Sequence, residues 1–99
     1  MKGYLIANVD VQNPEAYEAY RSRTAEIIAR HDGRFLVRGG RIEIREGMPS
    51  IHRLVILEFP SMEQARIFYD SEDYQAILPD RTNNAVSNVF LVEGCPPQM

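Results

Sequence analysis

Apolar and polar residues alternate in several stretches of the chain, which is typical of strands with two different faces. The stretches rich in β-branched and aromatic residues predict strands over 4–11, 34–38, 52–59 and 87–93. After Gly39-Gly40 the alternation resumes over 41–45. A tight hairpin at these glycines would set Arg38 beside Arg41, and paired like charges are unfavourable. We therefore favour a bend or bulge within one long strand at Gly39-Gly40.

Apolar residues at helical spacing follow the first strand. Asn13 is a good cap for a helix that begins at Pro14, and the spacing predicts a helix over about 14–31. Gly33 is expected to supply the left-handed residue that ends this helix. The first long helix therefore separates the first two strands.

A second helical region is predicted between the strand over 52–59 and the last strand. Ser61 and Gln64 form a capping-box pattern at its start. Ser71 is a further cap, for a short helical piece that Pro79 disturbs. Residues 80–86 are polar and are expected to be irregular.

The predicted order of elements is β-α-β-β-α-β, which is typical of the α+β ferredoxin-like fold. In that fold one antiparallel sheet carries its helices on one face, and alternation divides the strand residues into two sets. The set expected to face the helices is almost purely apolar: Leu5, Ala7, Val9, Phe35, Val37, Val55, Leu57, Phe59, Phe90 and Val92. The other set is mixed: Tyr4, Ile6, Asn8, Arg34, Leu36, Arg38, His52, Leu54, Ile56, Glu58, Val89, Leu91 and Glu93.

The mixed face carries too much apolar surface to remain in water. Leaving its large aliphatic side chains exposed would forfeit on the order of 10 kcal/mol, which rivals the whole stability of a small domain. These side chains are Ile6, Leu36, Leu54, Ile56, Val89 and Leu91. A second copy of the chain, packed sheet on sheet about a two-fold axis, is the economical cover. The polar members of the face would then line a cavity between the sheets.

The chain has 99 residues and a formal net charge of −3. This length predicts a single domain over 1–99, with an ordered core at about 2–94 and a tail over 95–99. The negative charge argues against nucleic acid as a partner. Cys95 is the one cysteine, so no internal disulfide is expected. No signal peptide and no membrane span are visible, which makes a cytoplasmic protein the expectation.

A family resemblance rests on four motifs. They are Gly33-Arg34-Phe35-Leu36-Val37-Arg38-Gly39-Gly40, Glu58-Phe59-Pro60-Ser61, Tyr69-Asp70-Ser71-Glu72-Asp73-Tyr74 and Leu91-Val92-Glu93-Gly94. Over nearly its whole length the chain resembles a bacterial family of small proteins of unknown function in the dimeric α+β-barrel superfamily. The resemblance implies a homodimer whose two sheets face each other, and it implies no reaction. Wider relatives include cofactor-free monooxygenases, muconolactone isomerases and haem-degrading oxygenases. The haem-degrading branch relies on a Trp, which this chain lacks.

Two titratable residues of the mixed face are candidates for proton transfer. His52 and Glu58 can each act as general acid or base near a cavity end. Apolar neighbours along the strand lead us to expect burial of Glu58 and a raised pKa. Two alternatives stay open: His52 caps the start of its strand in solvent, and Glu58 forms an ion pair with Arg34 or Arg38.

The bend between the second and third strands supplies candidate binding residues. Arg38 can hold a carboxylate in bidentate fashion, and Gly39 and Gly40 would let a ligand approach the backbone closely. Asn8 faces the same predicted cavity. The alternative is a bend that the dimer edge needs, with Arg38 bound to a carbonyl of the partner. The tyrosines, Tyr17, Tyr20, Tyr69 and Tyr74, are interpreted as core aromatics rather than catalytic phenols.

Neither metal-ligand spacing nor a phosphate-binding glycine loop is present, so we expect no metal and no cofactor. Three functions remain open. The first is a cofactor-independent enzyme, of isomerase, lyase or monooxygenase type, that acts on a small oxygenated organic molecule. The second is a protein that binds such a molecule without turnover. The third is a structural homodimer whose cavity is filled by its own side chains.

Overall fold

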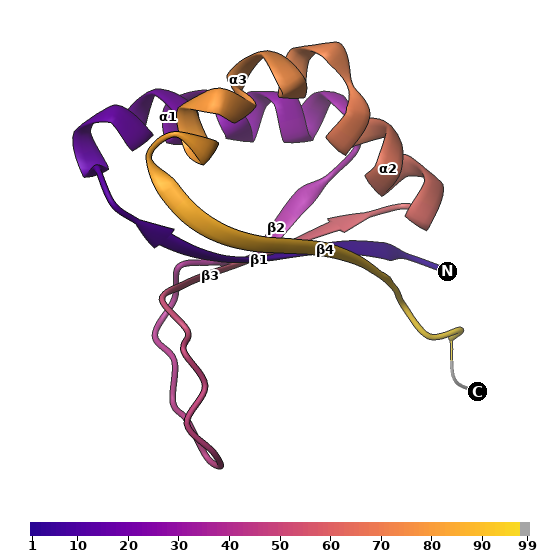
Figure 1. The fold of residues 1–99 in the computed structure, drawn as a ribbon. Coiled ribbons are helices and arrows are strands. Elements are labelled where there is room, and N and C mark those ends of the chain that lie inside the picture. The colour runs from indigo at the N-terminus through magenta and orange to yellow at the C-terminus, as the bar shows by residue number, and fades with distance from the viewer. Residues whose placement is uncertain (98–99) are drawn as a thin grey trace.

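The computed structural model describes residues 1–97, which form a four-stranded antiparallel sheet with three helices on one face (Figure 1). The elements are β1 (Gly3–Val11), α1 (Pro14–Arg30), β2 (Arg34–Arg38), β3 (Arg53–Phe59), α2 (Met62–Asp70), α3 (Glu72–Thr82) and β4 (Ala85–Glu93). The strand order across the sheet is β2-β3-β1-β4. The predicted ferredoxin-like fold is confirmed, with the second helical region divided into α2 and α3. The last two residues of the predicted tail, 98–99, lie outside the described part of the chain.

The start of α1 follows its local sequence, whereas its end differs from the prediction. Asn13 accepts a hydrogen bond from the Ala16 N–H (3.3 Å) and caps the helix. The left-handed residue after the helix is Asp32 (φ 62°), not Gly33. Asp tolerates this conformation better than most residues. Gly33 is needed for space instead, because a Cβ there would collide with the rings and methyls of Phe59 and Ile28.

The predicted break at Pro79 does not end α3. Ser71 caps the helix and accepts a hydrogen bond from the Tyr74 N–H (3.3 Å), and the helix continues past Pro79 to Thr82. The last turn is held by the Asn83 N–H, which donates to the Pro79 carbonyl (2.9 Å). A proline lacks only its own N–H, and its carbonyl remains free to accept. The expected irregular stretch over 80–86 is therefore helix first and then the start of β4.

The apolar alternation of β1 and β3 is confirmed as the floor of the core. Leu5, Val9, Leu57 and Phe59 are buried under the helices. The predicted phase of β4 is wrong. Leu5 pairs with Leu91 and Ala7 with Val89, so the odd residues of β4 face the helices. Phe90 and Val92 accordingly face the opposite side and are exposed.

A β-bulge in β2 changes the predicted faces of that strand as well. Phe35 pairs with Leu57, but after the register shift at Leu36 the next pairs are Val37 with Ile56 and Arg38 with Val55. One extra residue in a strand exchanges the two faces for everything that follows it. Val37 therefore faces away from the helices, and Arg38 lies on the helix side. The predicted irregularity exists, but it lies before Gly39-Gly40.

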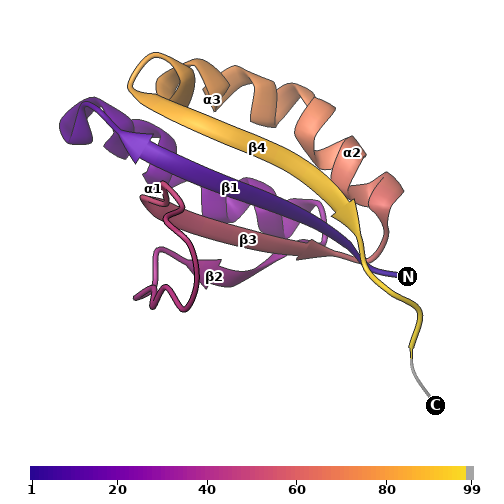
Figure 2. The ribbon, with the colours of Figure 1, turned by 60° about the horizontal axis from the view of Figure 1, so that its bottom comes forward.

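Residues 40–52 form an extended arm that projects from the helix-free side of the sheet (Figure 1). The expected continuation of the strand over 41–45 is not formed in the single chain. Asn8 fixes the base of the arm, because its Nδ2 donates to the Ser50 carbonyl (2.8 Å) and its Oδ1 accepts from the His52 N–H (2.9 Å). Figure 2 looks onto the helix-free face, where no element of residues 1–97 other than this arm stands in front of the strands.

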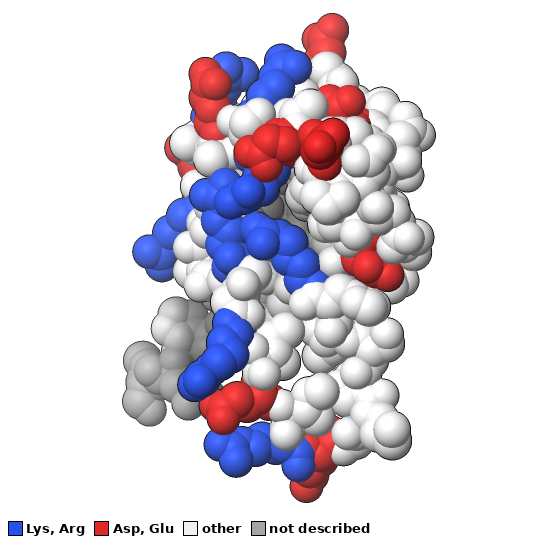
Figure 3. Space-filling view, turned by 90° about the vertical axis from the view of Figure 1, so that its left-hand side faces the viewer, with Lys and Arg blue, Asp and Glu red and all other residues white. Residues whose placement is uncertain are grey.

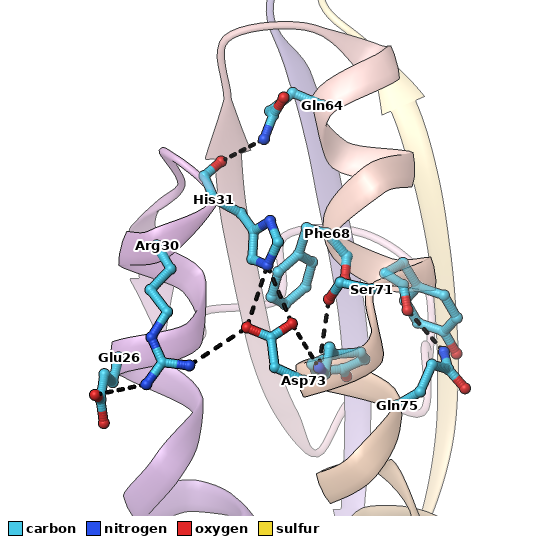
Figure 4. Close-up of polar contacts among 10 residues, drawn as sticks. Glu26, Arg30, His31, Gln64, Phe68, Ser71, Asp73 and Gln75 are labelled. Atoms are coloured by element: carbon cyan, nitrogen blue, oxygen red, sulfur yellow. Dashed lines mark hydrogen bonds and ion pairs between the residues drawn. The ribbon is translucent and has the colours of Figure 1, made fainter.

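Polar contacts join the end of α1 to the start of α3 (Figure 4). His31 Nε2 lies 3.2 Å from Asp73 Oδ1, and Arg30 reaches the same carboxylate at 3.4 Å. The His31 carbonyl accepts a hydrogen bond from Gln64 Nε2 (3.0 Å). The Ser71 side chain and His31 lower the pKa of Asp73 to about 2 against the opposing effect of its partial burial. Asp73 therefore stabilises the folded protein in its charged form.

We expect Asp73→Asn to lower the free energy of unfolding by about 1 kcal/mol at neutral pH. The pKa of Asp73 is depressed in the folded state, so its stabilising effect is complete above pH 4 and is lost as the pH falls toward 2. Urea unfolding of both proteins at several pH values measures this directly. A difference between them that stays constant from pH 7 to pH 2 would contradict the assignment.

Candidate functional site

A cavity of about 50 Å³ lies between the sheet and helices α1 and α3. Its walls are mostly apolar and include Leu5, Val55 and Leu57 from the sheet and Phe68 from α2. Pockets with apolar walls and a few convergent polar groups are the usual form of small-molecule sites. The polar groups of this cavity come from tyrosines and arginines.

Two tyrosine hydroxyls meet at the helix side of the cavity. The hydroxyl oxygens of Tyr20, on α1, and Tyr74, on α3, are 2.7 Å apart, and their rings meet edge to face with centroids 6.1 Å apart. Burial, and then the neighbouring Tyr74, raise the pKa of Tyr20 far above its ordinary value. Burial also raises the pKa of Tyr74, and the positive charge of Arg81 opposes that rise. Both phenols are therefore neutral hydrogen-bonding groups at physiological pH.

Arginines from four elements line the same cavity: Arg21, Arg38, Arg53 and Arg81. No acidic residue of the described chain lines it. Arg81 is only 5% exposed, and its guanidinium lies 5.8 Å from the centroid of the Tyr20 ring. Figure 3, which looks at the end of the molecule where these elements meet, shows basic side chains gathered across its middle. The charged groups of the cavity lining are therefore all basic, on the side of the cavity toward this end of the molecule.

The binding residues predicted from the sequence are divided between this cavity and the arm. Arg38 lines the cavity, with its Cζ 4.3 Å from the centroid of the Phe35 ring. Gly39 has a positive φ of 69° and lies against the guanidinium of Arg53, where a Cβ would collide. Gly40 begins the arm and has open space around it. Asn8 is placed at the base of the arm, on the other side of the sheet.

The predicted proton-transfer residues lie on the helix-free face. Glu58 accepts a hydrogen bond from Arg34 Nε (2.9 Å) and one from the Tyr4 hydroxyl (3.2 Å). The hydrogen bond from Arg34 lowers the pKa of Glu58, and the opposing effect of burial is smaller, so the expected raised pKa is wrong. The ion pair with Arg34 was one of the two alternatives left open.

His52 stands at the base of the arm. Its Nε2 lies 3.4 Å from Ser50 Oγ and 3.7 Å from Asp10 Oδ2, and the side chain is half exposed. His52 and Glu58 remain apart on one strand, so the structure does not bring the two predicted proton-transfer groups together. Their catalytic roles stay predictions.

The sequence analysis missed Tyr20, Tyr74, Arg53 and Arg81 as residues of a site. The tyrosines are separated by 54 positions, and only the tertiary packing of α1 on α3 brings them together. Arg81 fell in a stretch expected to be irregular. Arg53 did leave a signal, because it alternates in phase with Val55, Leu57 and Phe59, the apolar residues of β3 that face the helices. A charged residue in phase with an apolar face indicates a cavity or a buried partner.

Within residues 1–97, no three side chains of His, Cys, Asp or Glu come together in a way that would hold a metal ion. No helix in the same part of the chain has the length and apolar character to cross a membrane.

Comparison with known proteins places the fold. The family model described as a domain of unknown function (DUF1330) matches residues 2–95. No match was found among curated protein sequences. RPA0582 from Rhodopseudomonas palustris, a protein of unknown function, is 19% identical with a TM-score of 0.74, over 97% of this chain and 84% of that chain.

Two further solved structures share the fold at lower identity. SnoaB from Streptomyces nogalater, a cofactor-independent oxygenase, is 15% identical with a TM-score of 0.63, over 97% of this chain and 95% of that one. An antibiotic biosynthesis monooxygenase is 15% identical with a TM-score of 0.54, over 97% and 100% of the two chains. Identities this low show a common ferredoxin-like fold and nothing about chemistry.

Tyr20 and Tyr74 are expected to resist ionisation while the protein is folded. An exposed tyrosine loses its proton near pH 10, so above that pH the folded state binds more protons than the unfolded state. The free energy of unfolding should fall by up to about 1.4 kcal/mol per pH unit for each of these groups. Ultraviolet titration of tyrosinate measures it, and Tyr20→Phe should remove one tyrosine from the late, unfolding-linked step. Ionisation of all 5 tyrosines near pH 10 with the fold intact would contradict the buried pair.

Proposed function

The chain belongs to the DUF1330 family of domains of unknown function, and from this membership and the cavity we propose that it is a cofactor-independent enzyme acting on a small oxygenated organic molecule. The observation that carries the proposal is the neutral Tyr20–Tyr74 pair, set in an apolar cavity beside the buried charge of Arg81. SnoaB, a cofactor-independent oxygenase, is an example of such an enzyme built on the same fold.

The common step of such enzymes is stabilisation of a deprotonated substrate. A phenol hydroxyl donates a hydrogen bond to an enolate or phenolate oxygen, and a guanidinium supplies the compensating charge. Low local polarity strengthens both interactions. A bound enol or phenol would therefore lose its proton to water more readily in this cavity than in solution. Isomerases, lyases and cofactor-free monooxygenases all use an anion of this kind.

The site residues follow from that chemistry. We assign Tyr20, Tyr74 and Arg81 to the reacting oxygen and keep Arg38 among the binding residues, although in the helix-side cavity rather than in the predicted cavity between two sheets. Glu58 and His52 are proposed instead to serve the helix-free face, because their contacts are with Arg34 and with the arm.

The helix-free face is proposed to bind a second copy of the chain, which makes the working unit a homodimer. The molecule is only 16 Å thick along its shortest axis, because a single helix layer covers a single sheet. The uncovered face presents apolar side chains in a continuous area, with Phe90 54% exposed and Val92 41% exposed beside Ile6 and Ile56. Monomers rarely leave such a patch in water. The arm, with Met48 99% exposed, would then lie along the partner.

Removal of the Tyr74 hydroxyl should slow the reaction and leave the fold intact. We expect Tyr74→Phe to slow hydrogen exchange at the α-carbon of enolisable ketones in D₂O by about a hundredfold, because the enolate that forms when solvent water takes the α-proton loses its donor. NMR follows this exchange without knowledge of the final product. Tyr69→Phe is the matched control, since Tyr69 lies next to Tyr74 and does not line the cavity. Equal rates in the two variants would remove the tyrosine pair from the mechanism, and no exchange with any ketone would favour a binding or structural role.

A charge on the helix-free face should break the dimer. Phe90→Asp is expected to weaken association by about 2 kcal/mol, or roughly thirtyfold in Kd, because an aromatic side chain that the second copy would bury is replaced by a carboxylate. Ile67→Asp makes the same type of change on the outer surface of α2, where Ile67 is 48% exposed, and should leave association unchanged. Sedimentation velocity over a concentration series distinguishes the two. A wild-type protein that stays monomeric at high concentration would overturn the assembly.

A further inference from the structure

We propose that the substrate is an organic acid, and that Arg38 and Arg53 hold its carboxylate on the basic side of the cavity while its apolar part enters between the sheet and the helices. This inference rests on the proposed function, because it concerns the same cavity. It assigns a second anionic contact, separate from the reacting oxygen at Tyr20, Tyr74 and Arg81. On the sheet side of the site, an arginine N–H group lacks an acceptor among the described residues.

Arg53 is the clearest sign of a missing anion. Its Nε is buried, and no group of the described chain accepts a hydrogen bond from it. A buried donor without an acceptor costs on the order of 1–3 kcal/mol, so such a group calls for a partner such as a water, an ion or a ligand. Ser87 Oγ is in the same condition, and its residue lies across Val9 from Arg53 in one row of the sheet. Both groups belong to the face that carries the cavity.

The backbone at Gly39 is shaped to admit the Arg53 guanidinium. Gly39 takes a positive φ of 69°, and its N–H bonds to the Leu54 carbonyl (2.8 Å). Any Cβ at this position would occupy the space that the Arg53 guanidinium fills. The glycine therefore gives the Arg53 guanidinium room at the end of β2, where Gly39 follows Arg38 in the chain.

Arg38 is held in place without an acidic partner. Its Cζ lies over the Phe35 ring, 4.3 Å from the ring centroid, which is within the range of a cation–π contact. No carboxylate of residues 1–97 lies within 4.0 Å of the Arg38, Arg53 or Arg81 guanidinium. Planar guanidinium groups bind carboxylates through two parallel hydrogen bonds. A carboxylate is therefore the ligand group that matches this pair.

The dimensions of the site indicate a short acid. The cavity of about 50 Å³ admits only a small apolar group. A wider hollow of about 310 Å³ adjoins it and shares Arg21 and Arg53. Arg21 is paired with Glu18 at 3.2 Å, so the free charge of this region belongs to the sheet arginines. A ligand with its carboxylate at Arg53 and a few carbon atoms beyond it would fill the cavity between the sheet and the helices.

Matched acids and amides test the inference on the wild-type protein. The pairs are butyrate with butyramide, crotonate with crotonamide, and benzoate with benzamide, with inorganic phosphate as a separate anion. We expect at least one acid to raise the melting temperature and to bind about tenfold or more tightly than its amide by calorimetry, since a charged pair of hydrogen bonds is lost in the amide. The affinity should fall with added salt. Acids that bind no better than their amides, or no better than phosphate, would overturn the inference.

Variants then locate the contact. Arg53→Met should weaken acid binding about tenfold and leave the amide unaffected. Arg66→Met is the matched control, because Arg66 is exposed on α2 and does not line the cavity. Arg38→Met repeats the test at the second arginine if Arg53→Met does not fold. Equal acid affinity in the Arg38, Arg53 and Arg66 variants would overturn the assignment.

The failure of this inference and the failure of the proposed enzyme give different results. Tyr74→Phe should retain acid binding, because the carboxylate does not contact that hydroxyl. Acid binding without any hydrogen exchange would remove the proposed enzyme and keep the carboxylate site. Hydrogen exchange on neutral ketones with no preference for acids would keep the enzyme and remove the carboxylate site.

Discussion

The packing of Phe68 joins the sheet, the helices and the site. Its ring is fully buried, with centroids 5.1 Å from Phe59 in the sheet and 4.5 Å from Tyr74 at the start of α3. Tyr74 in turn meets Tyr20 on α1 through its ring edge and its hydroxyl. One series of aromatic contacts thus runs from the core of the sheet to the polar end of the cavity. The distance between the two hydroxyls is therefore set by core packing rather than by a loop.

Helices cover only one face of the sheet, so the two faces have different surroundings. On the helix side, apolar strand residues leave a small cavity, and the polar groups that reach it come from tyrosines and arginines at one end of the elements. On the other side, Glu58, Arg34 and Tyr4 form a paired cluster within an exposed apolar surface. A paired, charged cluster of this kind suits an interface better than proton transfer, because the pKa of Glu58 is lowered, away from neutrality.

Local signals predicted the fold, and pairing between distant residues decided the rest. The caps at Asn13, Ser61 and Ser71 are confirmed because a cap depends on its immediate neighbours. The face of β4 could not be predicted, since residues 89–92 are all apolar and carry no alternation. Only their register with β1 settles which of them is buried. The site is formed by residues from three helices and the sheet, which local patterns do not bring together. Of the residues missed, Arg53 alone left a signal, because it alternates in phase with buried apolar residues of β3.

The bulge at Leu36 affects how a protein of this fold can evolve. Because it inserts one residue into β2, it determines whether Arg38 serves the cavity or the opposite surface. Loss of a single codon there would transfer the arginine, unaltered, from one side of the sheet to the other. Length variation in this strand is thus a route by which descendants of one ancestor acquire different pockets and different contact surfaces without any substitution in the residues concerned.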